Sequence, residues 1–178
     1  MRRPDEITPA DDVEAAVLAR AAAIGEATGT VVGVLEIDPD LADTAAFCAA
    51  YDRPLGTSAN CILVASRDDE PVVAANVVLA TTDLDVNRRV RKLLGVRKCS
   101  FAPADLVTRL TGMQIGGVTP FALPDGLALH LDTRLRDLDA VIVGGGSRRL
   151  KLEVAPAALA ALPGAVWVED LARPGREG

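Results

Sequence analysis

Aromatic side chains are scarce in this chain. Only 3% of its 178 residues are Phe, Trp or Tyr, whereas hydrophobic residues as a whole make up 49%. Val, Leu, Ile and Ala must therefore build the core, and a nucleic-acid interface made of stacked aromatic rings is disfavoured. With charged residues at 25%, the composition is that of a folded chain. We expect a single domain that buries a core without disulfides or metals.

Cysteine and histidine are also few. The cysteines are Cys48, Cys61 and Cys99; none has Cys-x-x-Cys spacing, and the lone His130 cannot complete a zinc site with them. Cys61 follows Asn60 inside an apolar stretch, which is more typical of core packing than of a nucleophile. No serine occupies a nucleophile elbow, so a catalytic triad is not indicated and we expect His130 to be a structural or surface residue.

Long hydrophobic runs are missing. No apolar stretch approaches the roughly 18 residues that a membrane helix needs. Residues 1–10 are polar and contain Pro4 and Pro9, which is unlike a secretory signal peptide. We therefore expect a soluble, cytoplasmic protein with reduced thiols.

The net charge of −6 disfavours a general nucleic-acid binder. The charge is nevertheless unevenly distributed. Residues 1–52 contain eleven acids and three bases, whereas residues 86–155 contain twelve bases and six acids. The first segment is thus −8 and the second +6. A basic face of this kind can meet a phosphate backbone locally, and such binding would depend on salt.

Hydrophobic patterning predicts an alternation of helices and strands. Helices are expected over 11–28, 41–51, 86–94, 104–110 and 156–162. Strands are expected over 31–37, 60–66, 71–80, 100–101, 127–132, 140–143, 150–154 and 166–168. Strands 60–66 and 71–80 flank a charged turn and are typical of a β-hairpin. Residues 1–10 resemble a loose tail, and residues 173–178 a polar tail. This order predicts one α/β domain with a mixed, mainly antiparallel sheet, which can close into a barrel with helices outside.

The most unusual stretch, 111–123, reads Thr-Gly-Met-Gln-Ile-Gly-Gly-Val-Thr-Pro-Phe-Ala-Leu. Gly112, Gly116 and Gly117 permit positive φ or close approach of a ligand, and Pro120 stiffens the segment. One interpretation is a helix C-cap followed by a turn. The other is a loop whose main-chain N–H groups hold an ester carbonyl, a ribose hydroxyl or a water.

Cations concentrate just before this loop. Within eleven residues lie Arg88, Arg89, Arg91, Lys92, Arg97 and Lys98. On a helix, Arg88, Arg91 and Lys92 would share one face. That face is either simply solvated or contacts a phosphate backbone without reading its sequence.

A second glycine cluster, at 144–146, precedes Ser147, Arg148 and Arg149. A phosphate-binding loop needs a strand before it and a helix after it, but here a strand follows. The cluster is more typical of a glycine hairpin turn. Arg148 and Arg149 could face an anionic ligand from that turn.

Taken in order, these pieces resemble the YbaK/ProX family of aminoacyl-tRNA deacylases, a domain also inserted in bacterial prolyl-tRNA synthetases. The resemblance covers roughly 31–171. Its most specific part is 110–123, in which Gly116-Gly-Val-Thr-Pro120 matches the GxxxP loop of the family. The second is 141–154, which matches the glycine-arginine hairpin.

The resemblance implies a mixed sheet curled into a barrel, with helices around it and a pocket at its mouth. It implies hydrolysis, in trans, of the ester that links a wrong amino acid to tRNA, usually in proline-, cysteine- or alanine-related mischarging. It implies no metal or other cofactor. The expected partners are the acceptor end of aminoacyl-tRNA and an aminoacyl-tRNA synthetase, without membrane or DNA. Residues 1–178 would form one domain, with helix 11–28 packed on a core of about 31–171.

The resemblance also names site residues. Candidates for the catalytic acyl pocket are Asn60, Gly116, Gly117, Thr119 and Pro120. Candidates for contact with the tRNA end are Arg88, Arg91, Lys92, Arg148 and Lys151.

Two of these positions depart from the family pattern. Members carry a lysine in a pattern like Ala-Lys-Thr-Leu where this chain has Asn60, and often an acidic residue where it has Lys151. An amide can hydrogen-bond a carbonyl or hydroxyl but brings no charge. The sequence therefore indicates a deacylase and leaves two alternatives open. One is a binding module for aminoacyl-tRNA, a nucleotide or a partner protein that kept the fold and lost catalysis. The other is an interaction domain that uses the acidic N-terminal helices.

Overall fold

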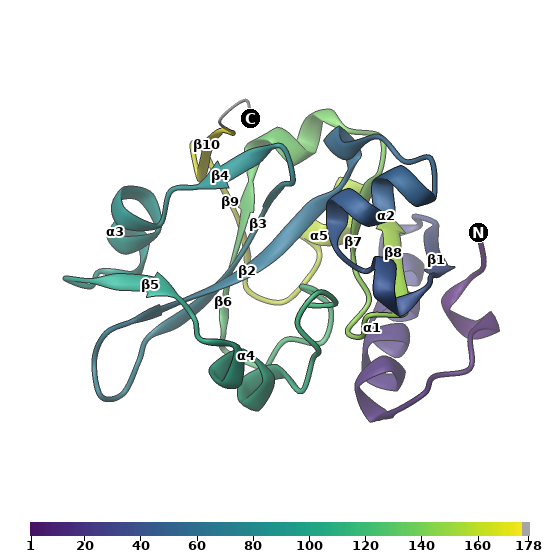
Figure 1. Cartoon of the computed structure of the whole chain (residues 1–178), viewed down its shortest axis with the longest axis horizontal. Helices are drawn as coiled ribbons and strands as arrows, with labels where there is room; N and C mark the ends of the chain where they lie inside the picture. The colour runs from purple at the N-terminus through teal and green to yellow at the C-terminus, as the bar shows by residue number, and fades with distance from the viewer. Residues whose placement is uncertain (176–178) are drawn as a thin grey trace.

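The computed structural model describes residues 1–175 (Figure 1). The strands are β1 (Val32–Glu36), β2 (Ala59–Ser66), β3 (Val73–Leu79), β4 (Thr82–Leu84), β5 (Cys99–Phe101), β6 (Ala128–Asp132), β7 (Val141–Gly144), β8 (Leu150–Val154), β9 (Ala165–Val168) and β10 (Ala172–Pro174). The α-helices are α1 (Asp12–Thr28), α2 (Thr44–Ala50), α3 (Arg91–Leu94), α4 (Ala104–Thr111) and α5 (Pro156–Ala160). Short helical turns are η1 (Pro4–Glu6), η2 (Pro39–Leu41), η3 (Leu55–Thr57), η4 (Val86–Val90) and η5 (Thr133–Asp137).

Local sequence signals explain where the long helix α1 begins and ends. The Asp11 carboxylate accepts a hydrogen bond from the Glu14 N–H at 2.9 Å, which caps the first turn. Gly29 ends the helix in the left-handed region, at φ 66°. Val17 and Ile24 lie on the buried face of the helix.

Within residues 1–175 the strands form three sheets. The largest has the order β5-β2-β3-β6-β9, a second has the order β1-β8-β7, and β10 pairs with β4. The β2–β3 and β7–β8 hairpins are antiparallel, while β3–β6 and β6–β9 are parallel. The prediction of a mixed, mainly antiparallel arrangement is therefore confirmed, as is the glycine hairpin at 144–146.

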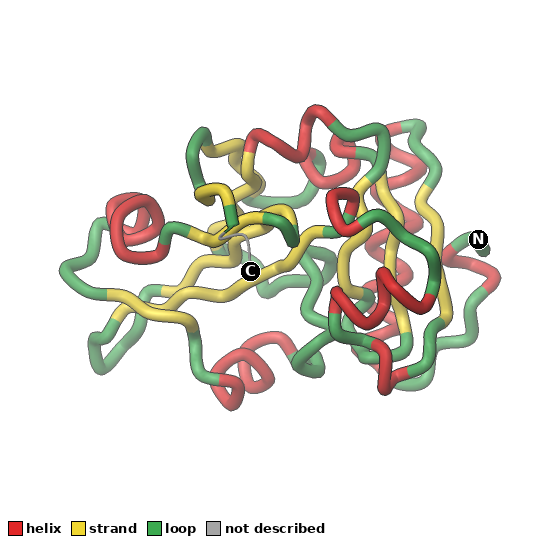
Figure 2. The backbone as a smooth tube through the Cα atoms, turned by 45° about the horizontal axis from the view of Figure 1, so that its top comes forward, coloured by secondary structure: helices red, strands yellow, loops and turns green. Residues whose placement is uncertain are grey.

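The expected barrel does not form: none of the sheets in the described part of the chain closes on itself. A closed barrel needs a continuous ladder of backbone pairs. Between the two larger sheets there is only a single bridge, from Ser58 to Ile142. On its outer side β2 pairs with β5 only from Val64 to Ser66. The first half of β2 is therefore a free edge facing β7, and Figure 2 shows the two sheets as separate groups of strands.

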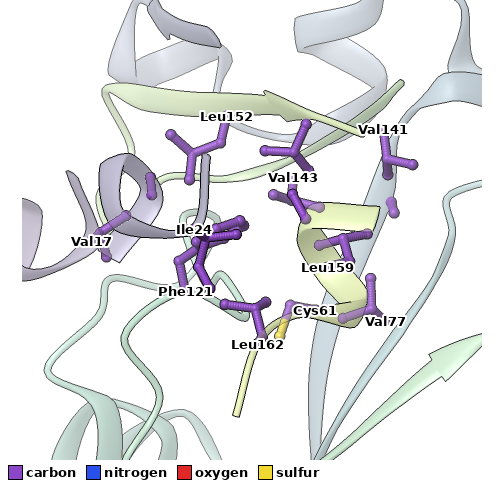
Figure 3. Close-up of a cluster of buried hydrophobic side chains, with 14 of the residues drawn as sticks. Val17, Ile24, Cys61, Val77, Phe121, Val141, Val143, Leu152, Leu159 and Leu162 are labelled. Carbon is purple, nitrogen blue, oxygen red and sulfur yellow. The ribbon is translucent and has the colours of Figure 1, made fainter. Parts of the chain in front are cut away.

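The main core lies between the two larger sheets. Val17 and Ile24 of α1 meet Val143 and Leu152 of the three-stranded sheet and Leu159 of α5 (Figure 3). A second cluster covers the opposite face of the five-stranded sheet, and its members include Val64, Val78, Leu84, Val90 and Leu171. The five-stranded sheet is therefore buried on both faces.

The N-terminal segment is not the loose tail that its sequence suggests. Arg2 and Val34 exchange backbone hydrogen bonds of 3.2 and 2.8 Å, so the segment extends the β1 edge. Pro4 and Ile7 are buried. At the other end of the chain, β10 pairs with β4, and neither of these short polar strands was predicted. Residues 176–178 of the expected C-terminal tail lie outside the described residues.

Candidate functional site

The free edge of β2 borders a cavity of about 480 Å³. Its floor is apolar and includes Cys61 and Leu63 of β2 and Val143 of β7. Polar groups reach it from the β2 edge, from α2 and from β8. The cavity thus exists because the two sheets fail to join, and it combines an apolar interior with a few polar side chains, as small-molecule sites do.

Lys151 enters this cavity from β8 and is only 6% exposed. Its ammonium donates to the Ala42 carbonyl at 2.8 Å and to the Gly116 carbonyl at 3.4 Å. Within residues 1–175, no carboxylate lies within ion-pair distance of Nζ. Burial lowers the pKa of Lys151; the Asp43 carboxylate opposes this effect, and the Arg148 guanidinium adds to it. An ammonium has three donors, so one remains for a ligand.

Asn60 lines the same cavity from the start of β2. Its Oδ1 accepts a hydrogen bond from the Thr44 hydroxyl of α2 at 2.9 Å. This bond fixes the amide and leaves its Nδ2 group as the available donor. Asn60 and Lys151 thus reach one cavity from two different sheets.

The glycine-rich loop contributes Gly116 to the wall. Gly116 has φ 93°, which favours glycine, and a Cβ there would come within 2.6 Å of Arg148 Nη1. Gly117 faces away from the cavity and packs on the hairpin: a Cβ there would lie 2.1 Å from the Ser147 carbonyl oxygen. The Gly146 N–H donates to the Gly117 carbonyl at 2.7 Å. The two glycine segments are therefore pressed together, backbone against backbone.

The other two loop candidates are not among the residues that line the cavity. Thr119 is fully buried, and its Oγ1 accepts from the Phe121 N–H at 3.4 Å. Pro120 is buried beside a separate small cavity near Leu123 and Leu162. Both residues belong to the support of the loop, and Gly116 is the candidate of this group that meets the cavity.

The two arginines of the hairpin have different surroundings. Arg148 donates through Nε to the Pro39 carbonyl at 3.0 Å and through Nη1 to the Ile115 carbonyl at 3.3 Å, so it braces the glycine loop. Arg149 instead pairs with the buried Glu14 carboxylate at 2.7 Å and with Glu36 at 3.1 Å. The expectation that Arg149 faces an anionic ligand is wrong, because α1 supplies its counter-charge.

The predicted tRNA contacts divide between two places. Arg148 and Lys151 lie at the 480 Å³ cavity or against its loop. Arg88 and Lys92 line a different cavity, of about 430 Å³, beside β10. Arg91 lines neither of them; its Nε donates to the Asn87 carbonyl at 2.8 Å.

Sequence reasoning missed the rim of the cavity. Phe101 on β5 is 60% exposed and Ile115 in the loop is 49% exposed, and both line the opening. Thr44 and Phe47 on α2 were also missed. The position of Ile115 between glycines was a signal for an exposed apolar contact; Phe101 carried none, because its exposure follows from the short edge strand on which it lies.

Cys61 and His130 are structural, as expected. Cys61 is buried, and burial raises the pKa of its thiol to about 12, so it stays protonated and unreactive. His130 Nδ1 lies 2.9 Å from Asn76 Oδ1, and burial lowers its pKa. No group of three or more His, Cys, Asp or Glu side chains within residues 1–175 is placed to hold a metal. No helix in this range has the length and hydrophobicity to cross a membrane.

The family model described as the aminoacyl-tRNA editing domain matches residues 38–162. The chain belongs to this editing-domain family. The resemblance to the YbaK family is thereby confirmed. The matched residues include the free edge of β2, the glycine loop and the glycine-arginine hairpin, which together surround the 480 Å³ cavity.

Solved structures share this editing-domain fold. One, a proposed trans-editing enzyme for prolyl-tRNA synthetase, is 22% identical with a TM-score of 0.76 over 94% of this chain and 100% of that one. Another, hypothetical protein APE2540, is 28% identical with a TM-score of 0.72 over 84% of this chain and 96% of that one. The uncharacterized protein YwhH of Bacillus subtilis (strain 168) is 28% identical over 95 residues, which are 52% of this chain and 60% of YwhH. The match to YwhH thus spans less than two thirds of that relative.

Proposed function

We propose that this editing domain is a trans-editing hydrolase that deacylates mischarged aminoacyl-tRNA of the proline-, cysteine- or alanine-related class. The observation that carries the proposal is the meeting of three groups at one cavity. These are the Lys151 ammonium, which has no carboxylate partner within residues 1–175, the Asn60 amide and Gly116 of the family loop. The family assignment supports the substrate, and the geometry supports the chemistry.

Ester hydrolysis joins a water oxygen to the acyl carbon and breaks the bond between that carbon and the ribose oxygen. The amino acid leaves as a carboxylate, one proton of the water passes to the ribose oxygen, and the other passes to solvent. Negative charge builds on the former carbonyl oxygen during the step. Fixed donors aimed at that oxygen lower the barrier. Lys151 Nζ and Asn60 Nδ2 are the donors we assign to this role. The Gly116 N–H, which forms no main-chain hydrogen bond within residues 1–175, is a third.

Lys151 compensates, in this proposal, for the lysine that family members carry where this chain has Asn60. The positive charge approaches the acyl group from β8 instead of β2. The carbonyls of Ala42 and Gly116 hold the ammonium in place without neutralising it. The charge is therefore available to a developing oxyanion in a partly dehydrated site, where it counts for more than in water.

The apolar floor supports a small acyl group. Cys61, Leu63 and Val143 offer no partner for a charged or polar side chain. One methylene more or less in such a pocket is worth only ~1–3 kcal/mol, so discrimination among small amino acids is modest. At the rim, the exposed Phe101 ring offers the terminal base of the tRNA an apolar surface.

The test is release of amino acid from a panel of mischarged tRNAs by the wild type, Lys151→Met, Asn60→Ala and Gly116→Ala. Removal of one oxyanion donor typically lowers turnover by about 10²–10³-fold, and we expect a loss of this size for Lys151→Met. Lys98→Met is the matched control, because Lys98 is exposed and outside the cavity. Wild-type protein that hydrolyses no substrate in the panel would refute the hydrolase proposal.

One observation favours a second function. Asn60 is an uncharged residue at the position of the family's lysine, and this suits a module that binds the acylated end without cleaving it. Binding of aminoacyl-tRNA that is weakened by Asn60→Ala, with no release of amino acid, would identify such a module.

A further inference from the structure

A second concave site lies away from the acyl pocket. It is the 430 Å³ cavity where η4 and α3 meet β10 and the η5 turn, and we call it the basic cavity. Within the described residues it shares no lining residue with the 480 Å³ cavity, the proposed acyl pocket. The cations that line it are Arg88, Arg89, Lys92, Arg134 and Arg173. The tertiary fold gathers them, because η4 and α3, the η5 turn and β10 are far apart in sequence.

The charges in the basic cavity do not balance. Among the described residues, 1–175, two carboxylates line it, and both are already engaged. Asp85 lies 3.6 Å from Arg173, and Asp170 lies 3.4 Å from Arg134. Within residues 1–175, the side chains of Arg88, Arg89 and Lys92 therefore have no carboxylate partner. Three uncompensated cations face one concavity in a chain whose net charge is −6.

Arg89 adds an independent observation. Its Nε is buried and has no hydrogen-bond partner among the described residues. A buried donor that lacks an acceptor costs about 1–3 kcal/mol. An anionic oxygen that enters the basic cavity would supply this acceptor and would also relieve the repulsion among the neighbouring cations.

The chemistry of the lining favours phosphate groups on a nucleic-acid backbone. Arginine guanidinium groups bind phosphate oxygens through paired N–H donors, and arginines make up four of the five cations here. Among the residues that the structure describes, no aromatic ring lines the basic cavity, so a free nucleotide would find nothing there on which to stack its base. Contacts of this kind position a nucleic acid without reading its sequence.

We propose that the basic cavity is a second RNA-contact site, which holds backbone phosphates of the tRNA while the acylated end occupies the acyl pocket. The proposal rests on the proposed function for the identity of the RNA. It assigns Arg89 to RNA contact, in addition to Arg88 and Lys92, while Arg134 and Arg173 stay paired with carboxylates at the edge of the cavity. It leaves Arg91 outside this contact although Arg91 lies on the same helical segment.

The experiment compares two triple variants that remove the same charge. The cavity variant is Arg88→Gln/Arg89→Gln/Lys92→Gln. The control is Arg91→Gln/Arg97→Gln/Lys98→Gln, whose positions are exposed and do not line the basic cavity. Binding of non-acylated tRNA is measured by fluorescence anisotropy over a range of salt, together with hydrolysis of a 3′-aminoacyl adenosine, which carries no phosphate. Thermal unfolding checks that each variant folds.

We expect the cavity variant to bind tRNA at least tenfold more weakly at low salt, with the control within threefold of wild type. The salt slope should fall by about 0.7–0.9 for each phosphate contact removed. Hydrolysis of the small ester should be unchanged. Because like-charge repulsion is relieved, the cavity variant should unfold at a temperature no lower than that of wild type.

The outcomes are distinct. Equal weakening in both triples would mean a diffuse positive field and would overturn the proposal, as would no weakening in the cavity variant. Pyrophosphate binding that the cavity variant abolishes, in a protein that binds no tRNA, would overturn the assignment to RNA. Selective loss of tRNA binding in a protein that hydrolyses no ester would support the RNA site while the proposed hydrolase function fails.

Discussion

Lys151 shows how one buried side chain can oppose stability while serving a site. Its ammonium lies among carbonyls and apolar side chains, and burial lowers its pKa. The unfolded chain therefore holds this proton more tightly than the folded chain. Burying a charge without a counter-ion disfavours the folded state. A buried ammonium that opposes stability in this way points to a functional role.

This predicts that Lys151→Met is more stable than wild type at neutral pH. Between the lowered pKa and 10.5, the unfolded wild type binds more protons than the folded form, so wild-type stability rises with pH in that window. The advantage of Lys151→Met should therefore shrink as the pH increases. Urea denaturation at neutral and alkaline pH gives the free energy of unfolding of both proteins. The difference between the two values cancels the contributions of the other titrating groups. A wild type more stable than Lys151→Met at neutral pH would contradict the interpretation.

At the scale of elements, the glycine loop and the β7–β8 hairpin act as one unit. Gly117 and Ser147 are in backbone contact, and Arg148 bridges to the Ile115 carbonyl. This contact sets the position of Gly116 at the 480 Å³ cavity. A small residue at 117 is therefore required by packing, although Gly117 does not line the pocket itself.

Gly117→Ala should destabilise the protein by ~1–3 kcal/mol, the usual cost of forcing an extra methyl group into a packed region. Turnover should also fall, because Gly116 would be displaced with the loop. Gly56→Ala is the matched control: a Cβ there meets nothing within 4 Å and φ is not positive, so we expect a change within ~0.5 kcal/mol. Urea denaturation compares the two variants. Equal free energies of unfolding in the two variants would mean that the hairpin shifts to admit the methyl group, and would contradict the prediction.

At the scale of the whole molecule, a buried ion pair joins the start of the chain to its late hairpin. The Glu14 carboxylate on α1 is fully buried and accepts from Arg149 Nη2 at 2.7 Å and from the Ser147 hydroxyl at 2.5 Å. The Ala10 N–H also donates to it, at 2.7 Å. Burial alone would raise the pKa of Glu14, but these hydrogen bonds lower it below 4.5 overall. The N-terminal helix is thus fastened to the hairpin that carries Lys151.

Glu14→Gln should cost ~3 kcal/mol near neutral pH, because it leaves Arg149 without its buried partner. The lowered pKa means that this stabilisation is complete above pH 4.5 and is lost as the pH falls through the folded-state value. The difference in free energy of unfolding between wild type and Glu14→Gln should therefore become smaller at acidic pH. Glu26→Gln, on the exposed side of the same helix, is the control and should behave as wild type. Urea denaturation at neutral and acidic pH measures the free energies of unfolding. A difference between wild type and Glu14→Gln that does not depend on pH would contradict this role of the Glu14 carboxylate.

The sequence by itself determined the family and most of the elements, though not the short strands β4 and β10. Helix caps such as Asp11 and Gly29, the apolar strands and the turn glycines act through neighbours in the chain, so patterns of a few residues reveal them. The GxxxP loop and the glycine-arginine hairpin were recognisable for the same reason. The core role of Cys61 and the structural role of His130 also followed from their immediate surroundings.

Tertiary structure alone decided where the sheets separate, which arginine is neutralised and which cations gather. The expected barrel stays open because a single bridge joins the two larger sheets, and the free first half of β2 places Asn60 on the same cavity as Lys151. Arg149 is paired with a carboxylate on α1, and Arg88 shares a cavity with Arg173 of the unpredicted strand β10. Each of these contacts joins segments far apart in the chain. Their free energy depends on how whole elements pack, and no local pattern records it.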